Sequence, residues 1–384
     1  MKPAWNHENK APLGLYVHIP FCVRKCNYCD FLSFSADEQR KRQYVHALVQ
    51  EMERWRDSVS DYEVDTIFIG GGTPSVLSVA DMDILFRGIS DSFSKSGELE
   101  FTVECNPGTV DEEKLSLYCQ AGVNRISFGM QSTVDEELHH LGRIHSYEEF
   151  LHSYQLARRM SFDNINVDIM SAIPEQTLES YETTLHRVTE LAPEHISSYS
   201  LIIEEGTPFY ERYSSEPPVD EELDRQMYER TEEILAVAGY GRYEISNYAR
   251  PGWECRHNIK YWRRSEYLGI GLGAASMMKE CRFSNIRDMT AYMDGVQSGG
   301  NFVEEKDELT LAESKAEFMY LGLRMMQGVS VKEFEANFGE SLMDCYGDEI
   351  ARCERQGLLG CQGDHVFLTK RGIDVSNRVF AEFL

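Results

Sequence analysis

Six short apolar runs alternate with helix-length segments through roughly the first 240 residues of this 384-residue chain. This alternation predicts βαβ units, in which consecutive strands lie parallel and helices cover the sheet. Polar or glycine-containing stretches follow the runs, and the carboxyl ends of parallel strands are where such sheets bind ligands. The predicted strands are Leu15–His18, Thr66–Ile69, Glu100–Glu104, Arg125–Phe128, Asn164–Ile169 and His195–Leu201.

The later part of the chain has a different pattern. Residues 214–222 are turn-rich and acidic, which indicates a solvated linker, and residues 241–305 hold glycines and aromatic residues expected in an accessory region. From about Asp307 the pattern predicts helices and a hairpin, as in a winged-helix-like domain. The expected domains are 1–240, 241–305 and 306–384. The predicted helices include Arg40–Arg56, Asp81–Phe93, Leu178–Leu191, Val331–Phe338 and Leu342–Gln356, and the hairpin strands are Leu358–Cys361 and Val366–Thr369.

Three cysteines lie in the loop after the first predicted strand. Cys22, Cys26 and Cys29 have the spacing C-x3-C-x2-C, with Tyr28 directly before the third. Three thiolates suit a [4Fe-4S] cluster whose fourth iron stays open to a small molecule. A structural zinc site needs four closed ligands, and no Cys or His follows at a matching short spacing. Incidental cysteines, or a zinc site completed from far along the chain, remain the alternatives.

Composition narrows the function classes. The net charge of −26 disfavours nucleic acid and anionic membranes as partners, since both bind basic patches. The acidic helices of 331–356 likewise disfavour DNA binding by the winged-helix-like domain. No transmembrane run or signal peptide is evident in the sequence. Because a chain without a signal peptide is expected in the cytoplasm, its ten cysteines are predicted to be free thiols and cluster ligands rather than disulfides.

The cysteine spacing and its aromatic neighbour resemble the hallmark of the radical S-adenosylmethionine (SAM) superfamily. That resemblance implies an α/β fold with a partial (β/α)6 barrel, a [4Fe-4S] cluster held by the three cysteines, and SAM on the open iron. Reduction of SAM by the cluster yields a 5′-deoxyadenosyl radical in this superfamily. The cofactors therefore carry the chemistry, while the protein supplies geometry and excludes water.

Further blocks along the whole chain resemble one branch of that superfamily, which contains anaerobic coproporphyrinogen III dehydrogenases and HemW-like heme chaperones. These blocks are YVHIPFCVRKCNYCDF, IFIGGGTPS, ECNPG, NRISFGMQS, LGRIH, YEISNYA, RHNIKYW with YLGIG, and LTKRG.

Most of these blocks supply expected SAM contacts. Glycines in the GGGTP loop let the backbone approach a ligand closely. The resemblance therefore implies that Gly71, Gly72 and Thr73 contact SAM. Arg143 is expected to bind the SAM carboxylate, because a guanidinium can hold a carboxylate through two hydrogen bonds. The other expected contacts are Glu104 for the sulfonium, amino group or ribose, Asp168 for ribose hydroxyls, Gln131, the flanking aromatics Tyr16 and Tyr28, and Ser200 near the adenine.

Two features favour the chaperone side of the branch. The dehydrogenase pattern has a fourth cysteine two residues after the third, where this chain has Phe31. Dehydrogenases also carry a longer segment ahead of the cysteine motif. In addition, His257-Asn-Ile-Lys-Tyr-Trp262 matches the H-N-x-x-Y-W signature of HemW-like proteins. His257 is either a heme ligand through neutral imidazole or a buried, hydrogen-bonded structural residue.

Two departures from the family pattern concern heme handling. Ala275 stands where family members commonly have histidine, in G-A-H-S, and Ser171–Thr177 (SAIPEQT) replaces the usual Y-G-L-P-G-Q-T. Glu175 in place of a glycine restricts the backbone of that loop.

The resemblance implies a heme chaperone that binds heme as cargo and delivers it to recipient heme proteins, with an electron donor for the cluster. Coproporphyrinogen III dehydrogenation is the first alternative, and a radical SAM enzyme on another substrate such as RNA is the second. Whether the protein is an enzyme stays open, as do the heme ligand, the recipient and the oligomeric state, for which a homodimer is one option.

Overall fold

The computed structural model describes residues 10–384. The first nine residues, on which the expected absence of a signal peptide partly rests, lie outside this range. Within it, no helix is long and apolar enough to cross a bilayer.

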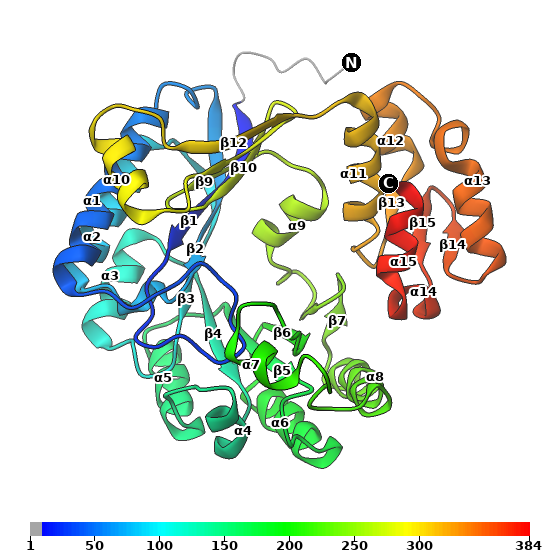
Figure 1. Ribbon diagram of the computed structural model, residues 1–384, viewed down its shortest axis with the longest axis horizontal. Helices are drawn as coiled ribbons and strands as arrows, with labels where there is room; N and C mark the ends of the chain where they lie inside the picture. Colours follow the sequence, from blue (N-terminus) through cyan, green and yellow to red (C-terminus); the bar gives the residue numbers. More distant parts are fainter. Residues whose placement is uncertain (1–9) are drawn as a thin grey trace.

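A large sheet forms the centre of the molecule, and its first six strands are parallel neighbours in chain order (Figure 1). Each of the six predicted strands is present, and the outer face of this curved sheet is covered by helices. The expected α/β class and partial barrel are therefore confirmed. The strands are β1 (Ala11–Ile19), β2 (Tyr62–Gly71), β3 (Lys95–Cys105), β4 (Arg125–Gln131), β5 (Ile165–Ser171) and β6 (His195–Ser200). The helices are α1 (Glu38–Trp55), α2 (Val79–Ser92), α3 (Glu112–Ala121), α4 (Asp135–His140), α5 (Tyr147–Arg159) and α6 (Leu178–Leu191), with a 3-10 turn at Pro74–Val76.

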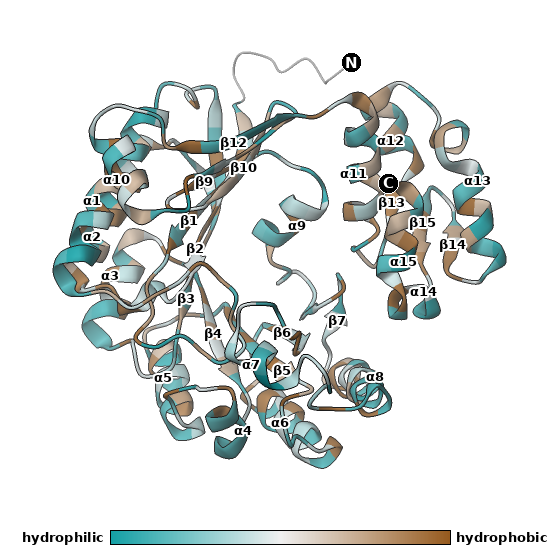
Figure 2. Cartoon of the chain, viewed as in Figure 1, coloured by the Kyte–Doolittle hydropathy of each residue, from teal (hydrophilic) through white to brown (hydrophobic). Residues whose placement is uncertain are grey.

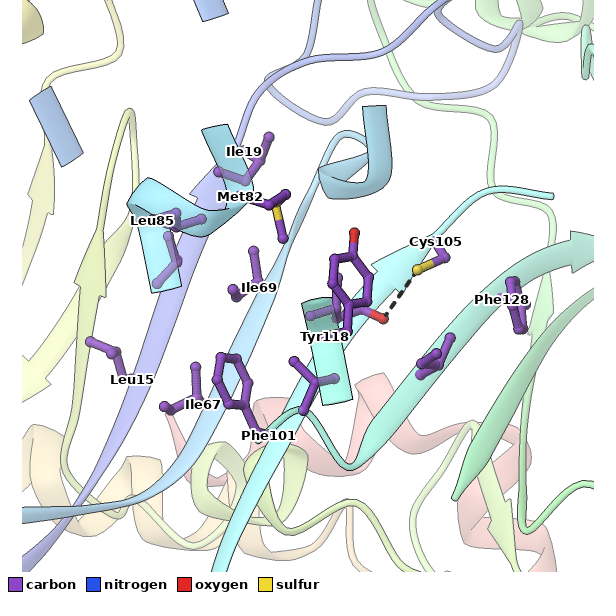
Figure 3. Close-up of a cluster of buried hydrophobic side chains, with 14 of the residues drawn as sticks. Leu15, Ile19, Ile67, Ile69, Met82, Leu85, Phe101, Cys105, Tyr118 and Phe128 are labelled. Atoms are coloured by element: carbon purple, nitrogen blue, oxygen red, sulfur yellow. Dashed lines mark hydrogen bonds between the residues drawn. The ribbon is translucent and has the colours of Figure 1, made fainter. Parts of the chain in front are cut away.

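Alternation of side chains gives the sheet two different faces. On β2, Ile67 and Ile69 point to the helices, and Phe101 does so on β3 (Figure 3). Successive strand residues point to opposite faces, so the polar residues between them point into the barrel. Burial of the apolar face against the helices drives the assembly of this sheet, and leaves a polar interior.

Side-chain caps set the ends of the covering helices. Helix α1 begins two residues earlier than predicted, because the Asp37 carboxylate accepts a hydrogen bond from the Arg40 N–H at 2.7 Å. Ser146 and Glu149 form a reciprocal capping box at the start of α5. Helix α3 ends at Gly122, whose φ of 90° is readily adopted by glycine.

Residues 241–305 extend the central sheet. Strand β9 pairs parallel with β1, while β8 pairs antiparallel with β6 at the other side of the barrel. Helix α9 lies in the opening between these two ends (Figure 1). The elements from the barrel to this region are α7 (Pro208–Tyr213), α8 (Glu221–Val237), β7 (Gly241–Arg242), β8 (Asn247–Ala249), α9 (Arg256–Trp262), β9 (Tyr267–Ile270), β10 (Ala275–Met278), β11 (Cys281–Asn285), α10 (Met289–Gln297) and β12 (Val303–Glu308).

The C-terminal residues pack around a second hydrophobic cluster, separate from that of the barrel. Three of its helices and a small sheet of order β13-β15-β14 give the expected winged-helix-like arrangement. Much of helix α13 (Leu342–Arg355) has the hydrophilic colour in Figure 2. The elements are α11 (Leu311–Gly322), β13 (Val329–Ser330), α12 (Val331–Phe338), α13 (Leu342–Arg355), β14 (Leu359–Gln362), β15 (His365–Leu368), α14 (Lys370–Asp374), α15 (Ser376–Phe380) and a 3-10 turn at Ala381–Phe383.

A buried carboxylate joins α1 to the added strands. Glu51 accepts hydrogen bonds from the Gly271 N–H at 2.8 Å, the Asn285 amide at 2.7 Å and the Tyr292 hydroxyl. Burial raises the pKa of Glu51 to about 7, although these hydrogen bonds act in the opposite direction. The folded state therefore holds a proton on Glu51 more tightly than the unfolded chain does.

This raised pKa predicts a specific pH dependence of stability. The contribution of Glu51 is fully present below its unfolded pKa near 4.5 and is lost as pH rises through about 7, in total on the order of 3 kcal/mol. Urea unfolding at pH 5, 6, 7 and 8 should show that Glu51→Gln gains stability relative to the wild type as pH rises. Glu53→Gln, on the exposed side of the same helix, is the control. Parallel pH profiles for wild type and Glu51→Gln would contradict the prediction.

The loop after β5 keeps a left-handed backbone without the usual glycines. Ala172 has φ 58° and Glu175 has φ 65°, at the two positions where the family pattern has glycine. An L side chain is disfavoured in this region by about 1–2 kcal/mol. The substitutions therefore preserve the shape of the loop and strain its backbone.

Glu175→Gly should stabilise the protein by about 1 kcal/mol, because the side chain is exposed and only backbone strain is relieved. Glu175→Ala keeps the Cβ atom and should show no such gain. Chemical denaturation of the wild type and the two variants measures their free energies of unfolding. An equal gain in stability in both variants would show that removal of the Glu175 side chain, and not relief of backbone strain, is the cause.

Candidate functional site

One cavity of about 420 Å³ opens inside the barrel. Five of the sequence-predicted residues line it together, although they come from different strands and loops. The polar side chains that point inward from β4, β5 and β6 line it as well, and sequence reasoning missed them. The predicted residues in the lining are Tyr28, Glu104, Gln131, Asp168 and Ser200, and the missed ones include Phe68, Arg125, Ser127, Asn166, Ser197 and Asn258.

The cysteine loop lies at the carboxyl end of β1, as predicted, and it is tied to its neighbours by backbone hydrogen bonds. Cys22 N–H donates to Phe34 O at 3.0 Å, and Asn27 N–H donates to Leu141 O at 3.0 Å. Within residues 10–384, no three His, Cys, Asp or Glu side chains converge closely enough to hold a single metal ion.

Hydrogen-bond donors surround the cysteine sulfurs. The Thr73 hydroxyl donates to Cys22 Sγ at 3.5 Å, and Arg143 Nη1 donates to Cys26 Sγ at 3.6 Å. Asn106 joins these two donors, because its amide contacts the Thr73 hydroxyl at 2.9 Å and Arg143 Nη2 at 2.9 Å. Such donors stabilise cluster-bound thiolates, so the donor set fits a [4Fe-4S] cluster. Asn106 was missed, although it stands in the ECNPG block.

The glycine loop differs from its expected form. Its N–H groups are not free for a ligand: Gly71 donates to Glu104 Oε2 at 3.1 Å, Gly72 to Ile19 O at 2.8 Å, and Thr73 to Phe21 O at 2.8 Å. Glycine is required for packing instead. Gly71 has φ 110°, and a Cβ atom there would lie 2.4 Å from the ring of His18. The loop thus shapes the cavity wall and orients Glu104.

Two buried carboxylates make the cavity suitable for a cation. Burial, together with the nearby charge of Asp168, raises the pKa of Glu104 to about 8. Burial also raises the pKa of Asp168, which accepts a hydrogen bond from the Asn166 amide at 2.7 Å. A positively charged ligand between the two carboxyl groups would lower the free energy that their ionisation requires. The carboxylates therefore fit the sulfonium and ammonium groups of SAM.

Two of the other expected contacts, Tyr16 and Arg143, are not part of the cavity lining. The Tyr16 hydroxyl contacts His18 Nδ1 at 2.9 Å, and its ring stacks on Phe68. Ser200 is at the exposed end of β6 and donates to Asp224 at 2.8 Å. Arg143 is buried beside the cysteine loop, where Gly129 O accepts from its Nη2 at 2.6 Å.

His257 has no free ring nitrogen. Its Nδ1 contacts the Thr66 hydroxyl at 2.9 Å, its Nε2 contacts the Tyr261 hydroxyl at 2.8 Å, and the ring stacks on Phe68. Burial, with the positive charge of Lys260, lowers the pKa of His257 to about 3, so the imidazole is neutral. This arrangement matches the structural role considered for this residue. Ala275 is exposed at the first position of β10.

The pKa of Glu104 predicts how SAM binding depends on pH. Because the carboxylate must ionise to pair with the cation, wild-type affinity should rise as pH rises toward about 8. Glu104→Gln should weaken SAM binding by about 1.5–3 kcal/mol at pH 8 and show a smaller pH dependence. Calorimetry on the reconstituted protein at several pH values measures both effects. Glu98→Gln, exposed on the same strand, is the control, and an unchanged pH profile in Glu104→Gln would refute the pairing.

Comparisons with known proteins agree with this geometry. Residues 16–188 match the model of the radical SAM superfamily, and residues 309–375 match the HemN C-terminal domain. The protein named heme chaperone HemW of Bacillus subtilis is 37% identical over 374 residues, covering 96% of this chain and 98% of that protein. Its namesake in Escherichia coli is 36% identical over 381 residues, covering 97% and 98%.

A solved structure supports the fold. Coproporphyrinogen III oxidase (HemN) from Escherichia coli, described as a radical SAM enzyme, superimposes with a TM-score of 0.87 over 97% of this chain and 90% of that chain. The sequence identity is 24%, so this likeness concerns the architecture alone.

Proposed function

Because the chain belongs to the HemW family of radical SAM proteins, we propose that it is a heme chaperone, which binds heme and delivers it to recipient heme proteins. The observation that carries this proposal is the match to proteins named heme chaperone HemW at 36–37% identity over nearly the full length of both chains.

The family uses a [4Fe-4S] cluster and SAM, and the residues of this chain fit both. The cluster and SAM supply one-electron chemistry when they are bound. Cys22, Cys26 and Cys29 would hold the cluster, with the Thr73–Asn106–Arg143 network donating to two of the sulfurs. This network connects the cysteine loop to the loops that follow β2 and β3.

The cavity residues would position SAM. Glu104 and Asp168 pair with its cationic groups and its ribose, while Gln131 and Tyr28 line the same space. Arg143, beside Cys26, would neutralise the SAM carboxylate. Tyr16, Gly71, Gly72 and Thr73 form the wall behind these residues, and Ser200 lies at the adenine end.

His257 has a structural role in this proposal. Its hydrogen bond to the Thr66 hydroxyl connects α9 to β2, whereas its hydrogen bond to Tyr261 lies within α9. Its ring stacks on Phe68, which lines the cavity. Coordination of heme iron through either ring nitrogen would break one of these hydrogen bonds. The HNxxYW signature thus maintains the shape of the cavity rather than coordinating iron.

The cellular setting follows from the same proposal. Heme delivery to proteins made in the cytoplasm places the chain there, and use of the cluster requires an electron donor. Recipient heme proteins, and a second copy of the chain in a homodimer, are the protein partners that belong to this proposal.

Oxidative decarboxylation of coproporphyrinogen III is the second candidate, because the sequence blocks of this chain also resemble those of the coproporphyrinogen III dehydrogenases. Phe31 argues against it. The dehydrogenase pattern has cysteine at this position, whereas Phe31 is a 63% exposed side chain on the cavity lining.

The test compares the two activities in one preparation. Anaerobically reconstituted protein with SAM and a reductant should bind heme with a shifted Soret band, and should form no protoporphyrinogen from coproporphyrinogen III. A known coproporphyrinogen dehydrogenase is the positive control for the second assay. Turnover of coproporphyrinogen III would overturn the chaperone proposal.

His257→Gln separates the two roles of His257 in the same assay. The amide can replace both hydrogen bonds but is a poor iron ligand, so the heme spectrum should stay unchanged. A changed axial-ligand spectrum would show that His257 coordinates heme.

A further inference from the structure

A buried arginine at the inner end of the cavity has no hydrogen-bonded partner. Arg125 is the first residue of β4, its side chain is part of the cavity lining, and the residue is 2% exposed. Its Nε has no hydrogen-bond partner, and Glu100 and Asp168 act on its guanidinium only through longer-range electrostatics. A guanidinium carries five N–H donors, and buried donors are normally satisfied.

The neighbouring carboxylates are already engaged elsewhere. Glu100 accepts the backbone N–H groups of Arg256 and His257 at 2.9 Å each, and so caps the start of α9. Asp168 accepts from the Asn166 amide at 2.7 Å. Thr102, which pairs in register with Arg125, has a buried hydroxyl that also lacks a partner. Arg125 is therefore left as an unpaired donor in the cavity lining, which does not include Thr102.

Arg125 lies away from the SAM carboxylate clamp. Gln131 ends β4 on the side of the cysteine loop, about 20 Å from the start of the strand at the usual rise per residue. Arg143 is on that side, with Cys26 as a neighbour. Arg125 thus lines the cavity, whereas Arg143 lies beside the cluster loop and is not part of that lining. One SAM molecule has a single carboxylate for these two residues.

We infer that Arg125 binds a propionate side chain of the tetrapyrrole cargo, which inserts into the barrel beneath SAM. This inference rests on the proposed heme-chaperone function and deepens it. The cavity of about 420 Å³ is lined by polar side chains at this end, so it suits a carboxylate group. The Arg125 guanidinium can hold such a carboxylate through two hydrogen bonds.

The experiment compares heme with heme dimethyl ester, which has no free carboxylate, on anaerobically reconstituted protein with SAM. Wild-type protein should prefer heme by about 10- to 100-fold, the range of a charged hydrogen-bonded pair. Arg125→Gln should lose most of this preference while it still binds the ester. Arg125→Lys keeps the charge without the planar fork and should keep part of the preference. Arg87→Gln, on the surface, is the matched control.

The outcomes separate the inference from the function on which it rests. Failure of both ligands to bind wild type would defeat the chaperone proposal. Equal binding of both ligands to wild type, or an undiminished preference in the Arg125 variants, would overturn the Arg125 site alone. A loss of SAM affinity in Arg125→Lys, measured by calorimetry, would assign Arg125 to SAM instead and would also overturn the inference. If circular dichroism shows that Arg125→Gln is unfolded, the Arg125→Lys comparison decides.

Discussion

The two-faced parallel sheet is the constraint on which the rest of the structure depends. Each strand gives alternate apolar residues to the covering helices, and burial of that face supplies the main driving force for folding. The other residues of each strand must then point inward, where helices do not cover them. The cavity is therefore a direct consequence of the same alternation that builds the core.

Burying the polar side chains inside the barrel costs desolvation free energy. Hydrogen bonds compensate this free energy for some of these side chains and not for others. Asn166 bonds to Asp168, His195 and Ser127 within the barrel, so much of the inner surface is satisfied by neutral groups. Glu104 and Arg125 are two exceptions, because Glu104 has a pKa raised to about 8 and the Nε of Arg125 lacks a hydrogen-bonded partner. Residues that are destabilised in this way mark where a ligand of opposite charge would bind.

The elements after the barrel complete it. Strand β9 adds to one side of the sheet through β1, β8 adds to the other through β6, and α9 fills the opening between them. Glu100 caps α9, and His257 bonds the helix to β2. The HNxxYW segment thus helps to form the wall of the cavity. The contacts of His257 favour a structural role for this residue over a role as heme ligand.

The sequence by itself determined the positions of the six strands, the winged-helix-like end and the cysteine loop, because periodicity, turn residues and Cys spacing are local signals. The polar residues inside strands, such as Arg125 and Asn166, also follow a local period of two, but this period alone does not show that they line one cavity. Only the tertiary structure decided that Gly71 is needed for packing against His18, that 241–305 joins the sheet, and that His257 has no free nitrogen. These properties depend on contacts between residues far apart in the chain, such as Thr66 with His257, and no local pattern contains them.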